Sequence, residues 1–288
     1  MMASARFVAL TSITSIALTL GACSRQSGNK SVDAPGEAAS KVVVAQPTGN
    51  QRPTVNRAAL FTPFNQAVRL DPPDDELRPP DVTAGGKVTA KLFEQIAGKD
   101  GMGGLWDEVK FVDATGKHVK QFAMMKTDAG DVRIELFHET APNHVRSFIC
   151  LARTGYFDGL PFHASVRRGD KETLQGYLET GCPKGTGEIG CGSIGYWLKP
   201  EVSDKLSHEE GTVGAWHPGE IERAACRFYI TLGRNPALDG NYTIFGKVVH
   251  GLDVLHTINK KPIQDEAHKG PQLAPHRIQQ VLIESRQE

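Results

Sequence analysis

The fold is decided by the stretch MKTDAGDVRIELFHETAPNHVRSFICLARTGYFDG, which runs from Met125 to Gly159. After the turn Asp128-Ala129-Gly130, apolar and polar residues alternate from Val132 to Leu136, which predicts a half-buried strand. Pro142 then opens a helix whose apolar residues recur at helical spacing, and Gly155 ends it. The stretch therefore predicts a strand followed by an amphipathic helix.

Short motifs continue in one order as far as Ile258, and chance does not readily place seven of them at compatible spacing. They are Lys126-Thr127-Asp128-Ala129-Gly130, Ala141-Pro142-Asn143, Gly155-Tyr156-Phe157-Asp158-Gly159, Phe162-His163, Phe228-Tyr229-Ile230-Thr231-Leu232, Leu238-Asp239-Gly240 and Phe245-Gly246-Lys247-Val248-Val249. In this order they resemble a cyclophilin-type peptidyl-prolyl isomerase. The resemblance implies a mainly β fold, a closed eight-stranded antiparallel barrel capped by two helices.

The remaining periodicity agrees with that fold. Further strands are predicted at Phe228–Leu232 and Tyr242–Val249, and a short helix is predicted around Val254 to Ile258. Residues 277–284 alternate weakly and are expected to supply a last strand. Many short strands with two helices are typical of an antiparallel barrel capped by helices.

Composition excludes some classes of partner. Apolar residues make up 39% of the chain and charged residues 23%, which is ordinary for a globular protein. The 33 basic and 33 acidic residues cancel, and no basic run stands out. We therefore expect neither nucleic acid nor an anionic membrane surface as a partner, but another protein. The chain is expected to be a monomer.

The first residues are expected to form a targeting signal that is not part of the folded domain. Arg6 precedes an apolar run from Phe7 to Leu20, which is typical of a secretory signal and short for a bilayer span. The run ends in Leu20-Gly21-Ala22-Cys23, which is similar to a bacterial lipobox, so residues 1–22 are predicted to be removed and Cys23 to carry lipid. The alternative is an ordinary signal peptide with a stray cysteine. With Ser24 following, the resemblance implies a periplasm-facing protein of the bacterial cell envelope, held at the outer membrane by its lipid alone.

Three further segments are predicted. Residues 23–86 are rich in proline and small polar residues and should form a tether, apart from Phe61 and Phe64, which are candidates for docking on the domain. Residues 87–122 should form an accessory helix, ending before Gly98, and a hairpin from Phe111 to Phe122. Residues 123–288 should form the cyclophilin-like domain.

No cofactor or metal ion is expected. The ten histidines are scattered, and no cysteine spacing resembles a zinc site. In an oxidising compartment Cys150, Cys182, Cys191 and Cys226 can pair in three ways, and a bridge between Cys182 and Cys191 is the plausible one because a short glycine-rich loop separates them. The alternative is that all four are reduced and partly buried.

The chemistry that the resemblance implies needs a donor aimed at the prolyl nitrogen. In the family an arginine follows the Phe-His pair, whereas Ala164 follows Phe162-His163 here. Three arginines are candidates to replace it, Arg227 in place of a substrate-facing glutamine, and Arg167 and Arg168 on a nearby loop. The alternatives are that Arg227 pairs with Glu179 and that the other two are a solvated charged pair.

The resemblance also implies a proline slot. The residues expected to bind substrate are His163, Tyr177, Leu178, Trp216, His217, Tyr229, Leu238 and Tyr242. The register is open by a residue or more, so either Glu179 or Thr180 falls where the family has a glutamine. Several of these side chains have a structural alternative as barrel filling, His163 as a framework residue, and Trp216 as a plug of the groove.

Two functions follow. The first is a peptidyl-prolyl isomerase that assists the folding of exported proteins and acts on proline-containing segments through a divergent active site. The second is a non-catalytic cyclophilin-fold module that binds such segments or a protein partner. Loss of the expected arginine favours the second, and the retained slot with three nearby arginines favours the first.

Overall fold

The computed structural model describes residues 61–70, 78–168, 175–188, 192–263, 269–270 and 272–287. All of them belong to one unit, Pro53–Glu288. The predicted signal segment, Cys23, Cys191 and much of the predicted tether lie outside the described residues, as does the side chain of Arg168. None of the described helices is long and apolar enough to cross a membrane.

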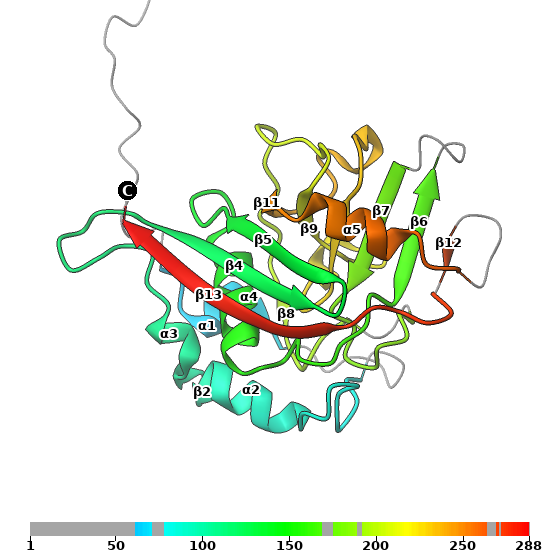
Figure 1. Ribbon diagram of the computed structural model, residues 1–288. Helices are drawn as coiled ribbons and strands as arrows, with labels where there is room; N and C mark the ends of the chain where they lie inside the picture. The colour runs from blue at the N-terminus through cyan, green and yellow to red at the C-terminus, as the bar shows by residue number, and fades with distance from the viewer. Residues whose placement is uncertain are drawn as a thin grey trace, which may run out of the picture. The chain divides into compact units, whose positions relative to one another are not determined.

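One antiparallel sheet dominates the fold, with its strands in the order β12-β6-β7-β10-β9-β11-β5-β4-β13 (Figure 1). Their bounds are β4 Val119–Thr127, β5 Gly130–Leu136, β6 Ala164–Arg168, β7 Gln175–Thr180, β9 Thr212–Ala215, β10 Phe228–Thr231, β11 Ile244–His250, β12 Lys269–Gly270 and β13 Ile278–Gln287. Eight strands and a two-residue edge strand agree with the mainly β prediction. The end strands β12 and β13 do not pair with each other within the described ladder, so the prediction of a closed barrel is not confirmed. An isolated bridge between Pro161 and Arg277 does link the segments that precede β6 and β13.

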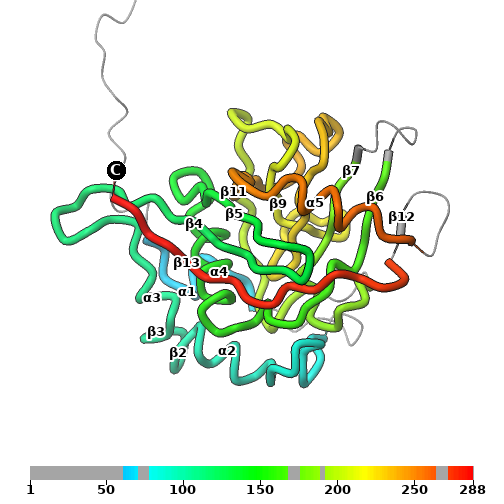
Figure 2. Tube along the Cα trace, viewed as in Figure 1, coloured from blue at the N-terminus to red at the C-terminus, as the bar shows by residue number. Residues whose placement is uncertain are grey.

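The weakly alternating C-terminal segment forms the longest strand. Strand β13 pairs antiparallel with β4 along its length, and Figure 2 shows the two strands running side by side. A register shift between Ile278 and Gln280 interrupts the alternation that a regular strand would show, which is why the sequence signal was weak. Ile278 and Val281 nevertheless reach the core.

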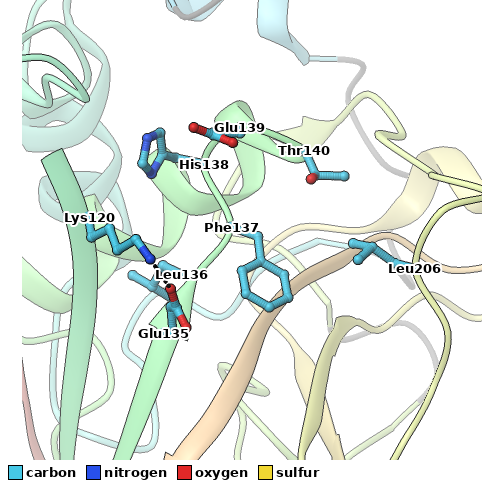
Figure 3. A pocket seen from close by; sticks show the side chains of 8 residues that line it. All are labelled: Lys120, Glu135, Leu136, Phe137, His138, Glu139, Thr140 and Leu206. Carbon is cyan, nitrogen blue, oxygen red and sulfur yellow. Dashed lines mark ion pairs between the residues drawn. The ribbon is translucent and has the colours of Figure 1, made fainter. Parts of the chain in front are cut away.

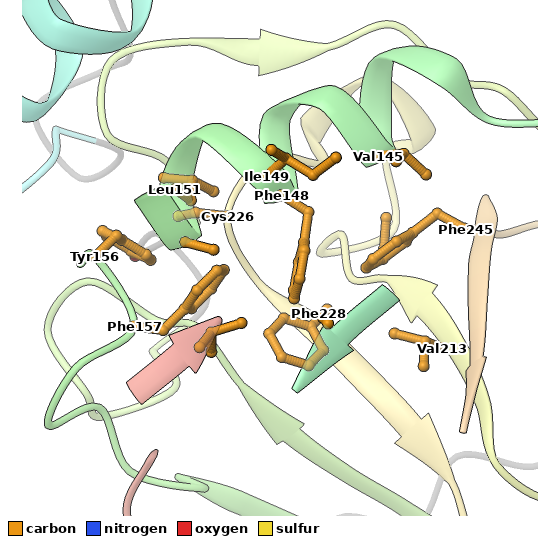
Figure 4. Close-up of a cluster of buried hydrophobic side chains, with 14 of the residues drawn as sticks. Val145, Phe148, Ile149, Leu151, Tyr156, Phe157, Val213, Cys226, Phe228 and Phe245 are labelled. Carbon is orange, nitrogen blue, oxygen red and sulfur yellow. The ribbon is translucent and has the colours of Figure 1, made fainter. Parts of the chain in front are cut away.

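Helix α4 (Pro142–Arg153) supplies one wall of the core. Figure 4 shows Phe148 pointing from this helix toward Phe228, and their ring centroids lie 5.5 Å apart. The Phe148 ring also lies 5.0 Å from Phe157 and 5.6 Å from Phe245. The second predicted helix, α5 (Leu252–Asn259), packs against β5. The apolar spacing seen in the sequence therefore marks the faces that these helices bury.

The N-terminal elements pack around a second aromatic group. They are α1 Phe64–Ala67, β1 Val68–Arg69, α2 Thr89–Ala97, β2 Gly98–Lys99, β3 Met102–Gly103 and α3 Leu105–Glu108, and β1 pairs with the later strand β8 Trp197–Leu198. Phe64 is buried among the rings of Phe93, Trp106 and Tyr196, at 5.2 to 5.8 Å. Phe61 stays 40% exposed. Of the two phenylalanines that were candidates for docking, only Phe64 is therefore fully buried on the domain.

The predicted hairpin from Phe111 to Phe122 is confirmed in its turn, but its paired part is shorter than predicted. An isolated bridge between Val112 and His118 joins its two halves, and backbone hydrogen bonds from Asp113 to Lys117 and from Val119 to Phe111 flank that bridge. The Asp113 carboxylate accepts hydrogen bonds from the backbone of Thr115 and Lys117 and fixes a tight turn between them. Beyond the turn the chain enters β4, which pairs with β5 and β13 instead, because those strands offer longer ladders.

Candidate functional site

A row of aligned residues crosses the outer face of the sheet where the resemblance places the reaction. Ala164 in β6 lies opposite Glu179 in β7, Glu179 lies opposite Tyr229 in β10, and Tyr229 lies opposite Gly214 in β9. Directly opposed residues point to the same face. The position where the family has its arginine is therefore next to Glu179, and Glu179 rather than Thr180 faces outward.

The neighbouring row points into the core and corrects one expectation. Leu178 lies between Ser165 and Ile230, and all three are fully buried. Leu178 thus fills the hydrophobic core and is not part of a slot, because a shift of one residue along a strand reverses the face to which a side chain points. Thr180 shares this face, and its hydroxyl donates to the carbonyl of Pro161.

Arg167 is not brought to the outer row either. It has the same parity in β6 as Ser165, and its guanidinium donates to the backbone carbonyls of Asn259 and Lys261 at the end of α5. The candidate role of Arg167 as a donor to substrate is therefore contradicted by its direction. The side chain of Arg168 lies outside the described residues.

Arg227 lies at the centre of the outer face, just before β10, and is 1% exposed. Its Nη2 donates to Oε2 of Glu179 at 2.8 Å, and its Nη1 donates to the carbonyl of Glu188 at 2.9 Å. The indole of Trp216 stacks on the guanidinium, with 3.3 Å from Cζ to the ring centroid. The alternative that Arg227 pairs with Glu179 is confirmed. Its Nε is buried and has no hydrogen-bond partner among the described residues.

His163 lies against the ion pair of Arg227 and Glu179. Its Nε2 lies 3.4 Å from Nη2 of Arg227 and 3.5 Å from Oε2 of Glu179. Burial alone would raise the pKa of Glu179, but His163 and Arg227 together hold that pKa below its usual value. Gly187, at a φ of +77°, lets the glycine-rich loop approach the imidazole, because a Cβ there would lie 2.5 Å from Cδ2 of His163. His163 is thus held as a framework residue.

Aromatic side chains lie beside the charged group. The ring of Tyr229 is 5.5 Å from that of Tyr177 and 5.6 Å from that of Tyr242. Tyr177 and Tyr242 are half-buried, as is Leu238 in the short 3-10 helix η4 (Pro236–Leu238). Tyr229 itself is buried, so the structure brings three predicted slot residues together as one aromatic surface.

Two residues behind Tyr229 were missed by the sequence interpretation. The Tyr229 hydroxyl lies 2.7 Å from Nε2 of His208, whose Nδ1 lies 2.8 Å from Oδ1 of Asp239. Since Nδ1 donates to the carboxylate, Nε2 accepts a hydrogen bond from the Tyr229 hydroxyl. Desolvation would raise the pKa of Asp239, but the hydrogen bonds from His208 and Arg234 lower it to about 2. Asp239 is part of the motif Leu238-Asp239-Gly240, which was the one sequence signal that could have pointed to it.

His217 and Trp216 flank the aromatic surface. The imidazole of His217 stacks on Tyr242 at 4.1 Å and donates from Nε2 to the carbonyl of Asn241, while its Nδ1 accepts from the backbone of Gly219. Burial lowers the pKa of His217, so it is neutral near pH 7. Trp216 is half-buried, and its ring covers Arg227 rather than the tyrosines.

The cysteines take no part in the site. Cys150 and Cys226 are buried free thiols, and burial raises the pKa of each to about 12. Cys182 is also buried, whereas Cys191 lies outside the described residues, so the predicted bridge between these two stays a prediction.

Comparison with known proteins gives one result for this part of the chain. Residues 122–283 match the family described as "Cyclophilin type peptidyl-prolyl cis-trans isomerase/CLD". The chain is 34% identical to chicken (Gallus gallus) peptidyl-prolyl cis-trans isomerase-like 3, over 50% of this chain and 86% of that protein. It is also 34% identical to a peptidyl-prolyl cis-trans isomerase of Helicobacter pylori, over 49% of this chain and 82% of that protein.

Solved structures agree. A Cryptosporidium parvum cyclophilin type peptidyl-prolyl cis-trans isomerase superposes with a TM-score of 0.51 and 26% identity, over 58% of this chain and 99% of that chain. The same Cryptosporidium protein, crystallised in the presence of the dipeptide Ala-Pro, superposes with a TM-score of 0.50 and 25% identity, over 57% of this chain and 99% of that chain.

Proposed function

The chain belongs to the cyclophilin-type peptidyl-prolyl cis-trans isomerase family, and from that premise we propose that it binds proline-containing segments and accelerates their isomerisation through Arg227. A related structure was determined in the presence of Ala-Pro, which supports a proline-containing ligand. The position of Arg227 on the outer face, in contact with Glu179 and Trp216, is the observation that carries the proposal.

Rotation about a prolyl bond needs no acid, base or nucleophile. The barrier is about 20 kcal/mol because rotation breaks amide resonance. As the amide twists, the prolyl nitrogen regains its lone pair, so a donor aimed at it interacts most strongly near the transition state. A guanidinium suits this task since it stays charged and presents several N–H groups in a plane.

Arg227 meets these requirements because its guanidinium is held in place and one of its nitrogens has no partner among the described residues. Glu179 and the carbonyl of Glu188 fix the guanidinium, so little reorganisation is needed when substrate arrives. Nε is the one nitrogen of this guanidinium without a partner among the described residues, and a buried donor without a partner is costly to leave unsatisfied. A bound peptide that reached Nε would remove that cost. Since Nε is covered in the free protein, binding must first displace part of the cover, and the half-exposed Trp216 is the side chain best placed to move.

The aromatic surface is proposed to hold the proline ring. Tyr177 and Tyr242 are half-buried and pack on the buried ring of Tyr229, and the half-buried Leu238 adds an aliphatic wall. The Tyr229 hydroxyl is hydrogen-bonded to His208, so the aromatic group leaves no unpaired tyrosine hydroxyl at Tyr229 beneath the proline. The slot thus binds by burial of apolar area, and the donor acts on the amide beside it.

A second function is favoured by one specific observation. Arg227 is neutralised by Glu179 and Ala164 supplies no donor, an arrangement that would grip a proline-containing segment without lowering the barrier. Such a binding module would bury the same peptide on the same tyrosines. The two functions therefore differ only in whether the bound amide rotates faster.

We place this activity at the bacterial envelope as a further part of the proposal, with exported proteins as clients. The lipobox-like Leu20-Gly21-Ala22-Cys23 supports a lipid anchor at Cys23 facing the periplasm. The mass of the mature N-terminus tests this: a diacylated or triacylated Cys23 is expected, and a mature chain that starts elsewhere contradicts the anchor.

Exchange NMR separates the two functions. The purified protein is added at substoichiometric concentration to a short X-Pro peptide, and cis-to-trans exchange is measured against the uncatalysed rate. Faster exchange supports the isomerase. Line broadening without faster exchange supports the binding module. If neither faster exchange nor line broadening is seen, both functions are contradicted.

A further inference from the structure

Two histidines and a glutamate gather at one end of the β4–β5 pair, away from the aromatic surface. In the ladder Gln121 lies opposite Leu136, so continuing the same register places position 118 opposite position 139. His118 comes just before β4, and His138 and Glu139 come just after β5. The hairpin therefore brings together residues that are twenty positions apart in the sequence, a spacing that no zinc motif would reveal.

The potential ligand atoms of these three residues all lie within 4.8 Å of one another. Nδ1 of His118 is 3.7 Å from Oε1 of Glu139, and the two imidazoles lie nearly parallel with centroids 5.9 Å apart. A metal ion with ligand distances of about 2.1 Å holds its donors no more than about 4.2 Å apart. Only a small closing movement is needed, and Glu139, whose side chain is 61% exposed, is free to make it.

The surroundings favour a ligand at this position. Nδ1 of His118 is buried and has no hydrogen-bond partner among the described residues, although such atoms are normally satisfied. The ring of His138 is stacked on Phe111 at 4.7 Å, which holds one donor rigidly in place. Figure 3 shows the neighbouring Lys120 pointing toward Glu135, with which it forms an ion pair at 3.4 Å, so its charge is compensated nearby.

We propose that His118, His138 and Glu139 bind a divalent transition-metal ion of the zinc class. Imidazole and carboxylate ligands suit zinc, whereas magnesium and calcium prefer oxygen ligands alone. Three protein ligands leave a fourth position open for water. A cavity of about 240 Å³, lined by Phe137, Thr140 and Leu206 as well as by His138 and Glu139, lies beside the cluster and has room for that water.

The bound ion would link the segment that precedes β4 to the segment between β5 and α4. These segments already meet through the stack of Phe111 on His138, and the ion would add a second link beside it. Since an ion that binds only the folded state stabilises it, zinc should raise the thermal unfolding midpoint. The site shares no residue with the proposed proline slot, so it stands independently of the proposed function.

The test is a zinc titration of the chelator-treated full-length protein by calorimetry at neutral pH. The variants are His118→Ala and Glu139→Ala, both at partly exposed positions where folding is not at risk. The matched control is His256→Ala, which removes another surface histidine from a His–Glu pair, with Glu210 at 2.8 Å and no third ligand among the described residues. Any zinc bound by thiols is common to all four proteins.

The parent and His256→Ala are expected to bind one more equivalent of Zn²⁺ than His118→Ala and Glu139→Ala. Zinc is also expected to raise the unfolding midpoint in the first two proteins alone. Equal zinc stoichiometry in all four proteins overturns the proposal. The proposal is also overturned if His256→Ala loses as much bound zinc as His118→Ala and Glu139→Ala.

Discussion

At the scale of single residues, the outer face is governed by one buried ion pair. Arg227 and Glu179 are 1% and 8% exposed at their side chains, so each charge depends on the other. Removing both charges from water is costly, and the pair repays that cost only through its hydrogen bonds and stacking. The sequence interpretation gave the pairing of Arg227 with Glu179 as an alternative, and the structure confirms it.

The pair predicts strongly coupled effects on stability. Arg227→Gln leaves Glu179 charged and buried without its partner, which should lower the free energy of unfolding by about 3 to 5 kcal/mol. The double variant Glu179→Gln with Arg227→Gln removes both charges and should lose less than the single variant. Urea unfolding of both measures this difference. Equal losses would show that the two side chains are independent.

Asp239 predicts a pH dependence. Its pKa in the folded protein is about 2, below the ordinary value of 3.8, because His208 and Arg234 hydrogen bond to it against the effect of desolvation. A lowered folded pKa gives stability that is present above the ordinary pKa and is lost as the pH falls toward the folded pKa. The advantage of the parent over Asp239→Asn in urea unfolding should therefore be complete near neutral pH and shrink between pH 3.8 and about 2. An advantage that does not change with pH would contradict this assignment.

At the scale of elements, the register of β7 decides what the site contains. Motif order predicted the strands and the helix, because hydrophobic periodicity and turn residues are local signals. The face of each side chain was not predictable in the same way, since a shift of one residue exchanges the two faces of a strand. Leu178 was consequently placed in the slot, whereas the structure puts it in the core beside Ile230.

Gly214 in β9 makes room for the aromatic surface. A Cβ at this position would lie 2.3 Å from Cζ of Tyr229, so Gly214→Ala must displace that ring. We expect a loss of about 1 to 3 kcal/mol in the free energy of unfolding and weaker binding of X-Pro peptides. Urea unfolding and a peptide titration measure the two effects.

Gly192→Ala is the matched control, because a Cβ there meets its nearest atom, in Trp197, at an ordinary 3.4 Å. Its stability and peptide binding should stay near those of the parent. If Gly214→Ala were equally neutral, Tyr229 would not lie over β9 as described.

At the scale of the whole molecule, the family and its β architecture were predictable because seven motifs share one order along the chain. The geometry of the charged site was not predictable, although its members were named, since they come from separate segments that meet only in the folded sheet. Arg227 precedes β10, Glu179 lies in β7, and Trp216 follows β9. The His118, His138 and Glu139 cluster escaped notice for the same reason, as a strand pair separates its ligands.

The end of the predicted tether also belongs to the folded unit. Phe64→Ala should lower the free energy of unfolding by about 3 to 5 kcal/mol, because the ring is buried among Phe93, Trp106 and Tyr196. Phe61→Ala, at a position that is 40% exposed, should cost much less. Chemical unfolding of the two variants compares them directly, and similar losses would argue that Phe64 is not docked.

The most direct test of the donor role of Arg227 is the exchange rate of an X-Pro peptide, measured by NMR with the parent, with Glu179→Gln plus Arg227→Gln, and with that pair plus Ala164→Arg. The parent should accelerate exchange, the double variant should lose the acceleration while staying folded, and the added arginine should restore it from the position that the family uses. An unchanged rate in the double variant, or no acceleration by the parent, would contradict the proposal that Arg227 supplies the donor.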